Sequence, residues 1–458
     1  MPLKTESLAS MCEAVVDCPH STPVWTDSGF VVLRNQNIKD GRLDLSAPSY
    51  TDEEHFKQRV RRMAPRPGDI VITREAPMGE VCKIPDGLTC CLGQRQVLLR
   101  PKAGINADYL LYALQSPVVQ EQIRWNEGTG STVSNIRIPV LEKIEIPRLG
   151  ASEQFIAAAL KSVDDKIDLN RRINQTLEAI AQAIFQSWFV DFEPVKAKIA
   201  ARAEGRDPLR AAMSAVSGKA DAELDALPPE QYEQLAATAV LFPDEMEESE
   251  LGEIPKGCIA GSLGDICNFT AGSAFSPEHQ GSAGGDYPFI KVSDMNLVGN
   301  EVFIQSANNY VSQARQLEMK AKLNPQGATV FAKIGVALIS NRRRLLITPT
   351  IIDNNMMSAS PIEGKSASYF LYSMLSTIDF NTLVSGTALP YLNVSDLRKI
   401  PIVRPLDGVC RAFELKAASI FLMMQKLAAQ SVTLASVRDA LLPKLLSGEI
   451  EVSGLDEG

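Results

Sequence analysis

The sequence predicts an α+β protein in which two mixed α/β heads with pseudo-two-fold symmetry are joined by two long antiparallel coiled-coil helices. Three observations predict this fold: two apolar heptad series, a constant offset of 257 residues between them, and a shared order of motifs before each series. A sustained 3.5-residue period keeps one apolar stripe of a helix against its partner. We therefore expect a duplicated chain with an internal paired-helix spacer.

The two heptad series step four, three, four, three without a slip, and each member of the first pairs with a member of the second. The first series is Ile156, Leu160, Val163, Ile167, Asn170, Asn174, Leu177, Ala181, Ile184 and Trp188. The second is Phe413, Ala417, Ile420, Met424, Leu427, Ser431, Leu434, Arg438, Leu441 and Leu445. At ~1.5 Å per residue the first series spans roughly 50 Å, and antiparallel packing predicts a head at each end of this spacer.

The segments before the two series share their pattern of strands and helices. The matching residues are 30–34 with 287–291, 67–72 with 325–330, 109–114 with 369–374, and 141–144 with 397–400. Each head is expected to run strand, hairpin, strand, helix, loop and short strand.

This organisation predicts six segments. They are a first head at 1–150, a first long helix at 151–193, an acidic linker at 194–255, a second head at 256–406, a second long helix at 407–448 and a tail at 449–458. The linker composition, helix-prone and then rich in proline and acidic residues, indicates a partly ordered, exposed connector.

The composition is that of an ordinary soluble protein, with 45% hydrophobic and 22% charged residues among 458. No charged-then-apolar leader and no apolar run approaching 18 residues occurs, so neither export nor membrane insertion is expected. None of the eight cysteines follows zinc spacing. We expect free thiols, a cytoplasmic location and no membrane partner.

The net charge of −9 is concentrated in one segment. Residues 201–255 carry 4 basic and 13 acidic side chains, whereas residues 1–150 carry 18 of each and residues 256–405 carry 13 basic and 10 acidic. The heads are therefore neutral to slightly basic. Because the distribution of charge matters more than its total, the acidity does not exclude DNA binding.

The motifs of several enzyme classes are missing from the sequence. It has three histidines, no cluster of metal ligands, no Walker lysine motif and no methyltransferase signature, since Pro228-Pro229 is preceded by Leu227 and followed by Glu230. The loop at 127–131 resembles a glycine-rich cofactor loop but lacks the preceding strand and following helix. A binding role is favoured over an enzyme, and no metal or cofactor is expected in this chain.

Basic and polar side chains in both heads are candidates for DNA contact. The acid-free stretch 55–68 is basic, and Arg342, Arg343 and Arg344 are expected at the tip of a hairpin between strands at 330–339 and 345–347. Neutralised phosphates supply affinity, whereas fixed donors and acceptors read bases. The full set is His20, Arg34, Asn35, Gln36, Arg61, Arg62, Arg66, Arg74, Thr129 and Ser131 in the first head, and Lys291, Ser293, Arg342, Arg343, Arg344, Thr387, Tyr391 and Asn393 in the second. For each basic run the alternative is a solvated loop, and for His20 a structural hydrogen bond.

The helix series also contain candidates for contact with partner subunits. Asn170 and Asn174 either fix the register of the helix pair or mark where groups of a partner enter. A second set is apolar and is expected at a helix end that two helices cannot easily cover. It contains Phe185, Trp188, Phe189, Leu442 and Leu446. It is either a docking surface or a satellite core against the second head.

Several segments resemble the specificity subunits of type I restriction–modification enzymes. They are residues 17–23 (Asp-Cys-Pro-His-Ser-Thr-Pro), 68–77, 92–95 (Leu-Gly-Gln-Arg), and the entry to the second head at 242–245 and 251–257. The resemblance covers nearly the whole chain in its order of head, helix, linker, head and helix. Two departures are Cys258, where the family usually has tryptophan, and the lack of an entry segment before the first head.

The resemblance implies that each head is a target-recognition domain for one half of an asymmetric, bipartite sequence in double-stranded DNA. It also implies that the helices dock two methyltransferase subunits and, through them, restriction subunits. Catalysis, and with it S-adenosylmethionine, ATP and magnesium, would belong to those partners.

Two other classes of function remain open from the sequence. The first is a non-catalytic scaffold whose heads bind proteins and whose helices only space them. Such a scaffold would show no sequence-selective retention of DNA. An enzyme ranks third, and methyl transfer by this chain alone would revive it.

Overall fold

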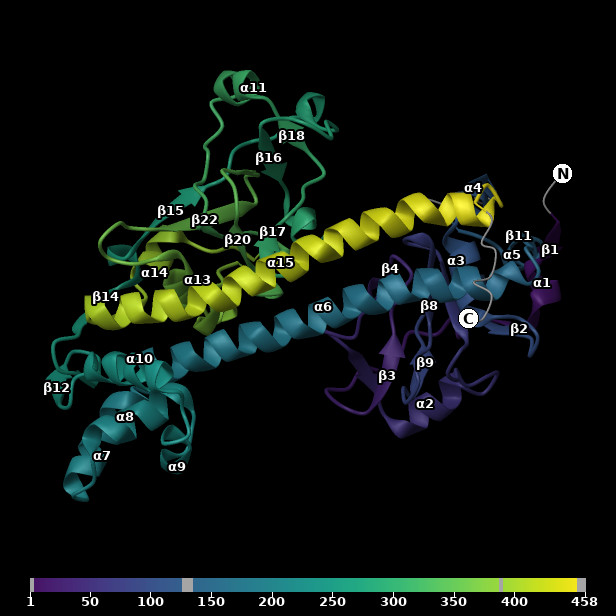
Figure 1. The fold of residues 1–458 in the computed structure, drawn as a ribbon. Coiled ribbons are helices and arrows are strands. Elements are labelled where there is room, and N and C mark those ends of the chain that lie inside the picture. Colours follow the sequence, from purple (N-terminus) through teal and green to yellow (C-terminus); the bar gives the residue numbers. More distant parts are fainter. Residues whose placement is uncertain (1–3, 126–134, 387–389, 451–458) are drawn as a thin grey trace. The chain divides into compact units, whose positions relative to one another are not determined.

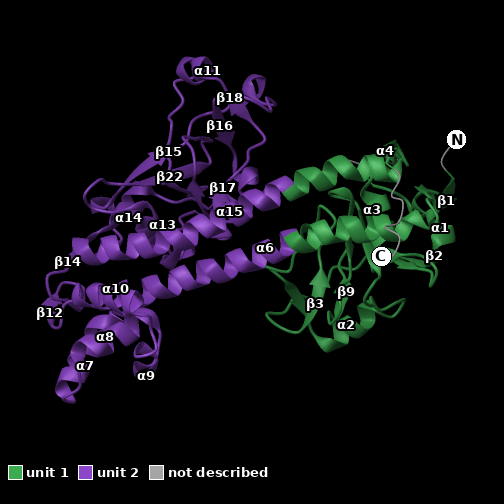
Figure 2. Ribbon diagram, viewed as in Figure 1, with its two compact units in different colours: residues 1–166, 434–458 green, residues 167–433 purple. Residues whose placement is uncertain are grey.

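The structure is a computed structural model that describes residues 4–125, 135–386 and 390–450. It divides into two compact units, unit 1 with Met1–Lys166 and Leu434–Gly458, and unit 2 with Ile167–Thr433 (Figure 2). Two long helices, α6 (Ser152–Phe189) and α15 (Asp407–Leu446), extend through both units (Figure 1). Each unit therefore contains one head and a part of each long helix.

The head of unit 1 is built on two main sheets. The four-stranded sheet has the order β2 (Cys12–Asp17), β10 (Gln96–Pro101), β7 (Ile70–Arg74) and β8 (Met78–Lys83). The three-stranded sheet has the order β6 (Ser49–Thr51), β3 (Phe30–Leu33) and β9 (Cys90–Leu92). The short pairs are β1 (Thr5–Ser7) with β11 (Glu145–Pro147) and β4 (Ile38–Lys39) with β5 (Arg42–Leu43). The helices are α1 (Leu8–Met11), α2 (Glu53–Arg59), α3 (Ala107–Gln115), α4 (Pro117–Trp125) and α5 (Ile138–Leu141).

Helix α3 illustrates how local sequence and burial agree in this head. Asn106 caps it, because its side-chain oxygen accepts the amides of Asp108 and Tyr109 at 2.9 and 3.1 Å. The six residues from Tyr109 to Leu114 are all buried. They join strands β7 and β10 and the first turns of α6 in one apolar core.

The head of unit 2 repeats this arrangement. Its larger sheet has the order β15 (Cys267–Ala271), β22 (Met356–Pro361), β19 (Thr329–Ala332), β20 (Arg343–Leu346) and β17 (Phe303–Ile304). The smaller sheets are β18 (Tyr310–Val311), β16 (Tyr287–Ile290) and β21 (Ile351–Ile352), and the pair β14 (Ile259–Ser262) with β23 (Pro401–Arg404). The helices are α11 (Gln313–Glu318), α12 (Val336–Ile339), α13 (Ser368–Thr377) and α14 (Val394–Arg398).

The strand pairings confirm the duplication that the sequence predicts. In each head a central strand pairs antiparallel on one side and parallel on the other, β3 with β6 and β9, and β16 with β18 and β21. The hairpin of β7 and β8 corresponds to the antiparallel pair of β19 and β20. Helices α3 and α13 lie at matching places in the order of elements.

The segment between the heads is more regular than its composition indicates. It forms α7 (Glu193–Ala203), α8 (Pro208–Ser217), α9 (Asp221–Leu224), α10 (Pro229–Val240) and the hairpin of β12 (Met246–Ser249) and β13 (Gly252–Pro255). Ala212, Met213, Leu224 and Ala239 form a small buried core there. The acidic side chains lie outside this core, so a helical subdomain takes the place of the expected exposed connector.

The two long helices pack antiparallel in each unit, as the heptad pattern predicts. In unit 1 the side chains of Asp164 and Arg438 pair at 2.8 Å. In unit 2 the amide nitrogen of Asn170 lies 3.4 Å from the Ser431 hydroxyl, and the Trp188 ring contacts the Phe413 ring near the other end of this stretch. Rising numbers on α6 thus meet falling numbers on α15. Every member of both heptad series is buried or half-buried.

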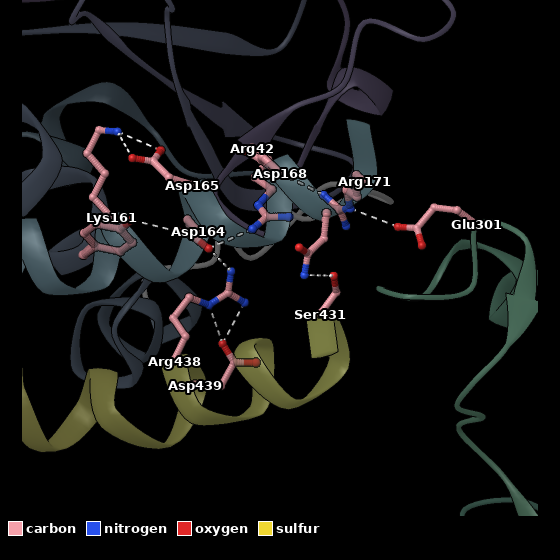
Figure 3. Close-up of polar contacts among 12 residues, drawn as sticks. Arg42, Lys161, Asp164, Asp165, Asp168, Arg171, Glu301, Ser431, Arg438 and Asp439 are labelled. Carbon is pink, nitrogen blue, oxygen red and sulfur yellow. Dashed lines mark hydrogen bonds and ion pairs between the residues drawn. The ribbon is translucent and has the colours of Figure 1, made fainter. Parts of the chain in front are cut away.

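Asp164 is the centre of a polar cluster in unit 1 (Figure 3). Its carboxylate accepts hydrogen bonds at 2.8 Å from Arg438 of α15, Arg42 of β5 and the Tyr112 hydroxyl of α3. Burial raises the pKa of this carboxyl group, but the two guanidinium groups and the tyrosine lower it by more, so its pKa lies below the ordinary value. One carboxylate thus links both long helices to the first head.

Helix α15 is long and apolar enough, by length and composition, to cross a membrane. In the structure a part of its apolar surface is buried. Phe413, Phe421 and Met424 are buried in the core of unit 2. One such helix is weak evidence for a membrane span, because the core helix of a soluble protein passes the same test of length and composition.

We expect Asp164→Asn to lower the free energy of unfolding of unit 1 by roughly 3 kcal/mol, because it leaves two largely buried arginines without their shared anion. Urea titration monitored by circular dichroism measures the change. Asp165→Asn is the matched control, since this exposed neighbour pairs only with Lys161 among the described residues and should cost about 0.5 kcal/mol or less.

The same cluster predicts a pH dependence. The lowered pKa of Asp164 stabilises the folded state above the carboxyl group's unfolded pKa, and this stabilisation is lost as the pH falls through the lowered value. The wild-type advantage over Asp164→Asn should therefore be full at pH 7 and shrink in acid. An advantage that stays constant down to pH 2 would contradict the assignment.

Candidate nucleic-acid interface

The same pair of reciprocal hydrogen bonds recurs at the end of the central strand in both heads, and we call this pair the backbone lock. In the first head the Arg34 amide donates to the side-chain oxygen of Asn37 at 2.9 Å, and the Asn37 amide returns a bond to the Arg34 carbonyl at 2.8 Å. In the second head Lys291 and Asp294 make the same two bonds at 2.7 and 3.0 Å. Both heads therefore fix a basic residue at the same structural position, as the pairing of the two sequence patterns predicts.

The neighbouring strand contacts are also repeated. The amide of Gly93 donates to the Leu33 carbonyl at 2.8 Å, and the amide of Asp353 donates to the Ile290 carbonyl at 3.0 Å. A Cβ atom at Gly93 would lie 2.4 Å from the Leu33 oxygen, so this approach requires glycine there. The requirement explains the glycine in the segment at 92–95.

A second basic residue follows the hairpin strand of each head. The amide of Arg74 donates to the Arg95 carbonyl at 2.9 Å, and the amide of Lys333 donates to the Asn355 carbonyl at 2.9 Å. Arg74 lies at the end of β7, and Lys333 follows β19 directly. Strand ends therefore bring basic side chains from separate segments to one edge of each head.

In the first head this edge is a charged rim, which we define as Asp17, His20, Arg74, Glu75 and Arg95. Arg74 pairs with Asp17 at 2.9 Å, His20 lies 3.1 Å from the same carboxylate, and Arg95 pairs with Glu75 at 2.7 Å. Arg74 is thus committed to a protein carboxylate, whereas His20 and Arg95 remain exposed. His20 has a structural partner and an exposed ring, so both of its predicted roles remain open.

The residues next to Arg34 differ in their freedom. Gln36 is exposed, whereas the side-chain amide of Asn35 donates to the carbonyl of Glu75. Asn35 therefore ties the Arg34 turn to the charged rim. Its role in the described structure is to hold that turn, and its oxygen has no hydrogen-bond partner there.

The basic stretch at 55–68 separates into one structural arginine, at the end of α2, and three exposed ones. Arg59 is buried, and its guanidinium donates to the carbonyls of Leu92 and Gly93 at 2.8 Å each. Burial lowers the pKa of Arg59. The exposed set contains Arg61, Arg62 and Arg66. Phosphate contact by these three residues stays a prediction, and Arg66 also lies 3.5 Å from Glu13.

The predicted arginine hairpin tip in the second head is wrong. Residues 336–339 form helix α12, and Arg343 and Arg344 lie inside strand β20. Arg343 is only 6% exposed, stacks on the Phe380 ring at 4.1 Å and donates to the Ile378 carbonyl. Burial lowers its pKa to about 10.

Arg344 is also a structural residue in this head. Its guanidinium donates to the Met295 carbonyl at 3.1 and 3.2 Å, and burial lowers its pKa. Arg343 and Arg344 are therefore not available to phosphates, because main-chain carbonyls already accept from them. Arg342 alone of the three is exposed, with a hydrogen bond to Asn296.

The other candidates in the second head vary in their availability. Ser293 and Tyr391 are exposed, and Tyr391 pairs with Ile334 next to Lys333. Lys291 is half-buried, and its ammonium group bonds to Gln280. Asn393 caps α14 by accepting the Ser395 amide at 3.1 Å, so its oxygen has a local role. Thr129, Ser131 and Thr387 lie outside the described residues.

The predicted partner-contact residues are buried within the chain. Phe185, Trp188 and Phe189 are 0, 2 and 5% exposed and pack with Phe370 and Phe413 in the core of unit 2. The docking surface expected there is wrong, and the alternative of a core against the second head is what the structure shows. Helix α13 covers this end of α6. The residue pattern of α6 alone could not reveal this contact, because α13 is distant in the sequence.

The remaining partner candidates are buried in a similar way. Leu442 and Leu446 are 8 and 3% exposed in the core of unit 1. Asn170 and Asn174 are 0 and 6% exposed, and Asn174 donates to the Met424 carbonyl at 3.1 Å. Neither asparagine is open to a partner, and their bonds across the seam favour the register-fixing interpretation.

Two aromatic residues beside the locked basic positions were missed by the sequence analysis. The Arg34 guanidinium lies over the Trp25 ring at 5.3 Å, and the Lys291 ammonium lies over the Phe275 ring at 5.4 Å. A large aromatic residue in a turn-rich, polar segment was the available signal for Trp25. In the described parts of the chain, no group of three or more potential metal ligands is assembled.

Comparisons with known proteins agree with this duplicated layout. The family model of the type I restriction modification DNA specificity domain matches residues 29–179 and again 255–407. The HindI specificity subunit of Haemophilus influenzae is 35% identical over 338 residues, which is 70% of this chain and 71% of that protein. The MjaIX specificity subunit of Methanocaldococcus jannaschii is 28% identical over 415 residues, or 88% and 82% of the two chains.

Among solved structures, the S subunit of a type I restriction–modification system from M. genitalium is similar over 97% of this chain and 96% of its own. The sequence identity is 16% and the TM-score is 0.48.

Because Arg342 is exposed and Arg343 is buried, we expect substitution of the first to affect DNA binding and substitution of the second to affect stability. Arg342→Ala should leave the melting temperature unchanged and lower the slope of log affinity against log salt by about 1, if this exposed side chain contacts a phosphate. Arg343→Ala should cost roughly 2 kcal/mol of stability, because carbonyl groups lose a charged donor. Salt-dependent DNA binding and thermal unfolding measure both effects, and the reverse pattern would refute the assignment.

Proposed function

Because the chain belongs to the type I restriction–modification DNA specificity family, we propose that it is the DNA target-recognition subunit of such a complex. Each head recognises one half of an asymmetric, bipartite target in double-stranded DNA. The observation that supports this best is the coincidence of the two family matches with the two heads that share one backbone lock.

The division into half-sites follows from duplication with divergence. The framework is repeated, but the side chains at its edge differ, with Arg34 and Arg74 in one head and Lys291 and Lys333 in the other. Base recognition depends on the donors and acceptors that such side chains present. Two copies with different side chains therefore suit two different half-sites.

The chain itself is proposed to be non-catalytic. Methyl transfer and DNA cleavage would be carried out by two methyltransferase subunits and by restriction subunits, which would also bind S-adenosylmethionine, ATP and magnesium. The complex is expected to act in the cytoplasm. The support is the family membership together with the absence from the sequence of the methyltransferase and Walker motifs.

The predicted partner-contact residues are buried. We therefore propose a different docking surface, on the exposed side of the long helices. On α15, Leu415, Leu422 and Met423 are 72, 51 and 48% exposed and lie at i, i+7 and i+8, on one face. Exposed apolar residues grouped on one helix face are typical of a protein interface. We propose this face for contact with a methyltransferase subunit.

Exchange of residues 256–405 for the corresponding head of a relative should change one half of the methylated sequence and leave the other half intact. The measurement is sequencing of methylated bases in a host that carries the partner subunits. The reciprocal exchange of residues 1–150 is the control and should change the opposite half. A change in both halves after a single exchange would refute the modular assignment.

Leu422→Glu with Met423→Glu should reduce co-purification with the methyltransferase subunit without lowering the melting temperature, since both side chains are about half exposed. Unchanged assembly would remove this face from the interface.

A further inference from the structure

We propose that Trp25 is a positioning residue that holds Arg34 to read a guanine in the half-site of the first head. The inference rests on the proposed function and deepens it, because it names a residue pair and a base. The observation behind it is an exposed guanidinium that lies over an aromatic ring and donates no hydrogen bond to the described residues of the chain.

The main chain of Arg34 is held more firmly than an ordinary strand end. Asn37 is 3% exposed, accepts the Arg34 amide at 2.9 Å and donates its own side-chain amide to the Asp44 carbonyl at 2.9 Å. Asn35 adds a bond to the Glu75 carbonyl. The turn that carries Arg34 is therefore fixed to two other segments of the head.

The side chain of Arg34 is held by stacking instead of by an acid. Its guanidinium lies 5.3 Å from the centre of the Trp25 ring, which is itself 47% exposed. Among the described residues no carboxylate or carbonyl group accepts from this guanidinium. A cation over a tryptophan face is attracted by the ring quadrupole, and this attraction leaves all five N–H donors open.

Other arginines at this edge lack that combination. Arg74 is paired with Asp17 at 2.9 Å, Arg95 with Glu75 at 2.7 Å, and Arg59 donates to buried carbonyls. These three have protein acceptors, so binding a base would require breaking a bond. Arg34 meets a ligand with its conformational freedom already reduced, and within the described residues it has no side-chain hydrogen bond that would have to break.

The ligand that fits is the major-groove edge of guanine. Its O6 and N7 are two adjacent acceptors, which match the planar fork of a guanidinium, and this is the commonest specific contact between arginine and DNA. A phosphate also accepts from arginine, but it carries no sequence information. The two ligands therefore differ in what a substitution at Arg34 changes.

The second head has the same backbone lock, but its cation and its aromatic ring both contact other residues of the chain. Its cation, Lys291, already bonds to Gln280, and the Phe275 ring is stacked on Phe289 with centroids 3.6 Å apart. Neither group is as available as its counterpart in the first head. The inference therefore applies to one half-site only.

The test uses the full chain co-expressed with its methyltransferase subunits, with sequencing of methylated bases and equilibrium binding to duplexes substituted at each position. Arg34→Gln should lower discrimination about 10- to 100-fold at one G·C pair in the half-site of the first head and leave the second half unchanged. Trp25→Ala should act at the same pair with a smaller effect, and Trp25→Phe should retain most of the discrimination.

Two control variants are matched in the same head. Trp125→Ala removes another exposed tryptophan, at 81% exposure, and Lys39→Gln removes an exposed positive charge. Both should leave discrimination at that pair unchanged. The melting temperature of each variant separates an effect on recognition from an effect on folding. Arg34→Lys is included as a milder change.

Three results would overturn the inference. A uniform loss of affinity across sequences, with a salt slope lowered by about 1, would assign Arg34 to a phosphate. Lost assembly with unchanged selectivity would assign the pair to a protein contact. Full discrimination at every position in both variants would remove the pair from DNA recognition. In each case a selective wild-type complex leaves the proposed function standing, whereas an unselective one refutes that function itself.

Discussion

The structure depends on the seam between two long helices that also belong to the cores of both heads. Residues of α6 and α15 are part of the main apolar core in each unit. Each helix therefore packs against the heads as well as against the other helix. Residues 152–166 and 434–446 complete the first head, and residues 167–189 and 407–433 complete the second. A change in the pairing of the helices would therefore disturb both recognition domains.

Polar groups make this pairing specific. An apolar seam alone tolerates a shift of register, whereas a buried donor or acceptor that loses its partner is costly. Asn170 and Asn174 bond across the seam in unit 2, and Asp164 binds Arg438 across it in unit 1. Tyrosines at matching positions of α3 and α13 extend these bonds to the heads, Tyr112 to Asp164 and Tyr372 to Glu178. Burial raises the pKa of Tyr372, and it also raises the pKa of Glu178.

The arginines of the heads divide into two functional groups by burial. Arg59, Arg343 and Arg344 satisfy main-chain carbonyls where separate segments meet, and their guanidinium groups act as cross-links within the fold. Arg34 and Arg61 remain exposed at the surface. A run of positive charge in the sequence therefore overstates the charge that a DNA backbone would meet. Some of its arginines are buried and donate to the protein's own carbonyl groups.

The sequence by itself determined the duplication and the antiparallel helix pair. These features follow from periodicity and turn residues, which depend on neighbours a few positions away along the chain. Only the tertiary structure decided which candidates are available for binding. Trp188 was covered by aromatic residues of other segments, and Arg343 was buried by Ile378 and Phe380, 35 and 37 positions further along the chain. Solvent exposure depends on such distant contacts, and a local pattern carries no record of them.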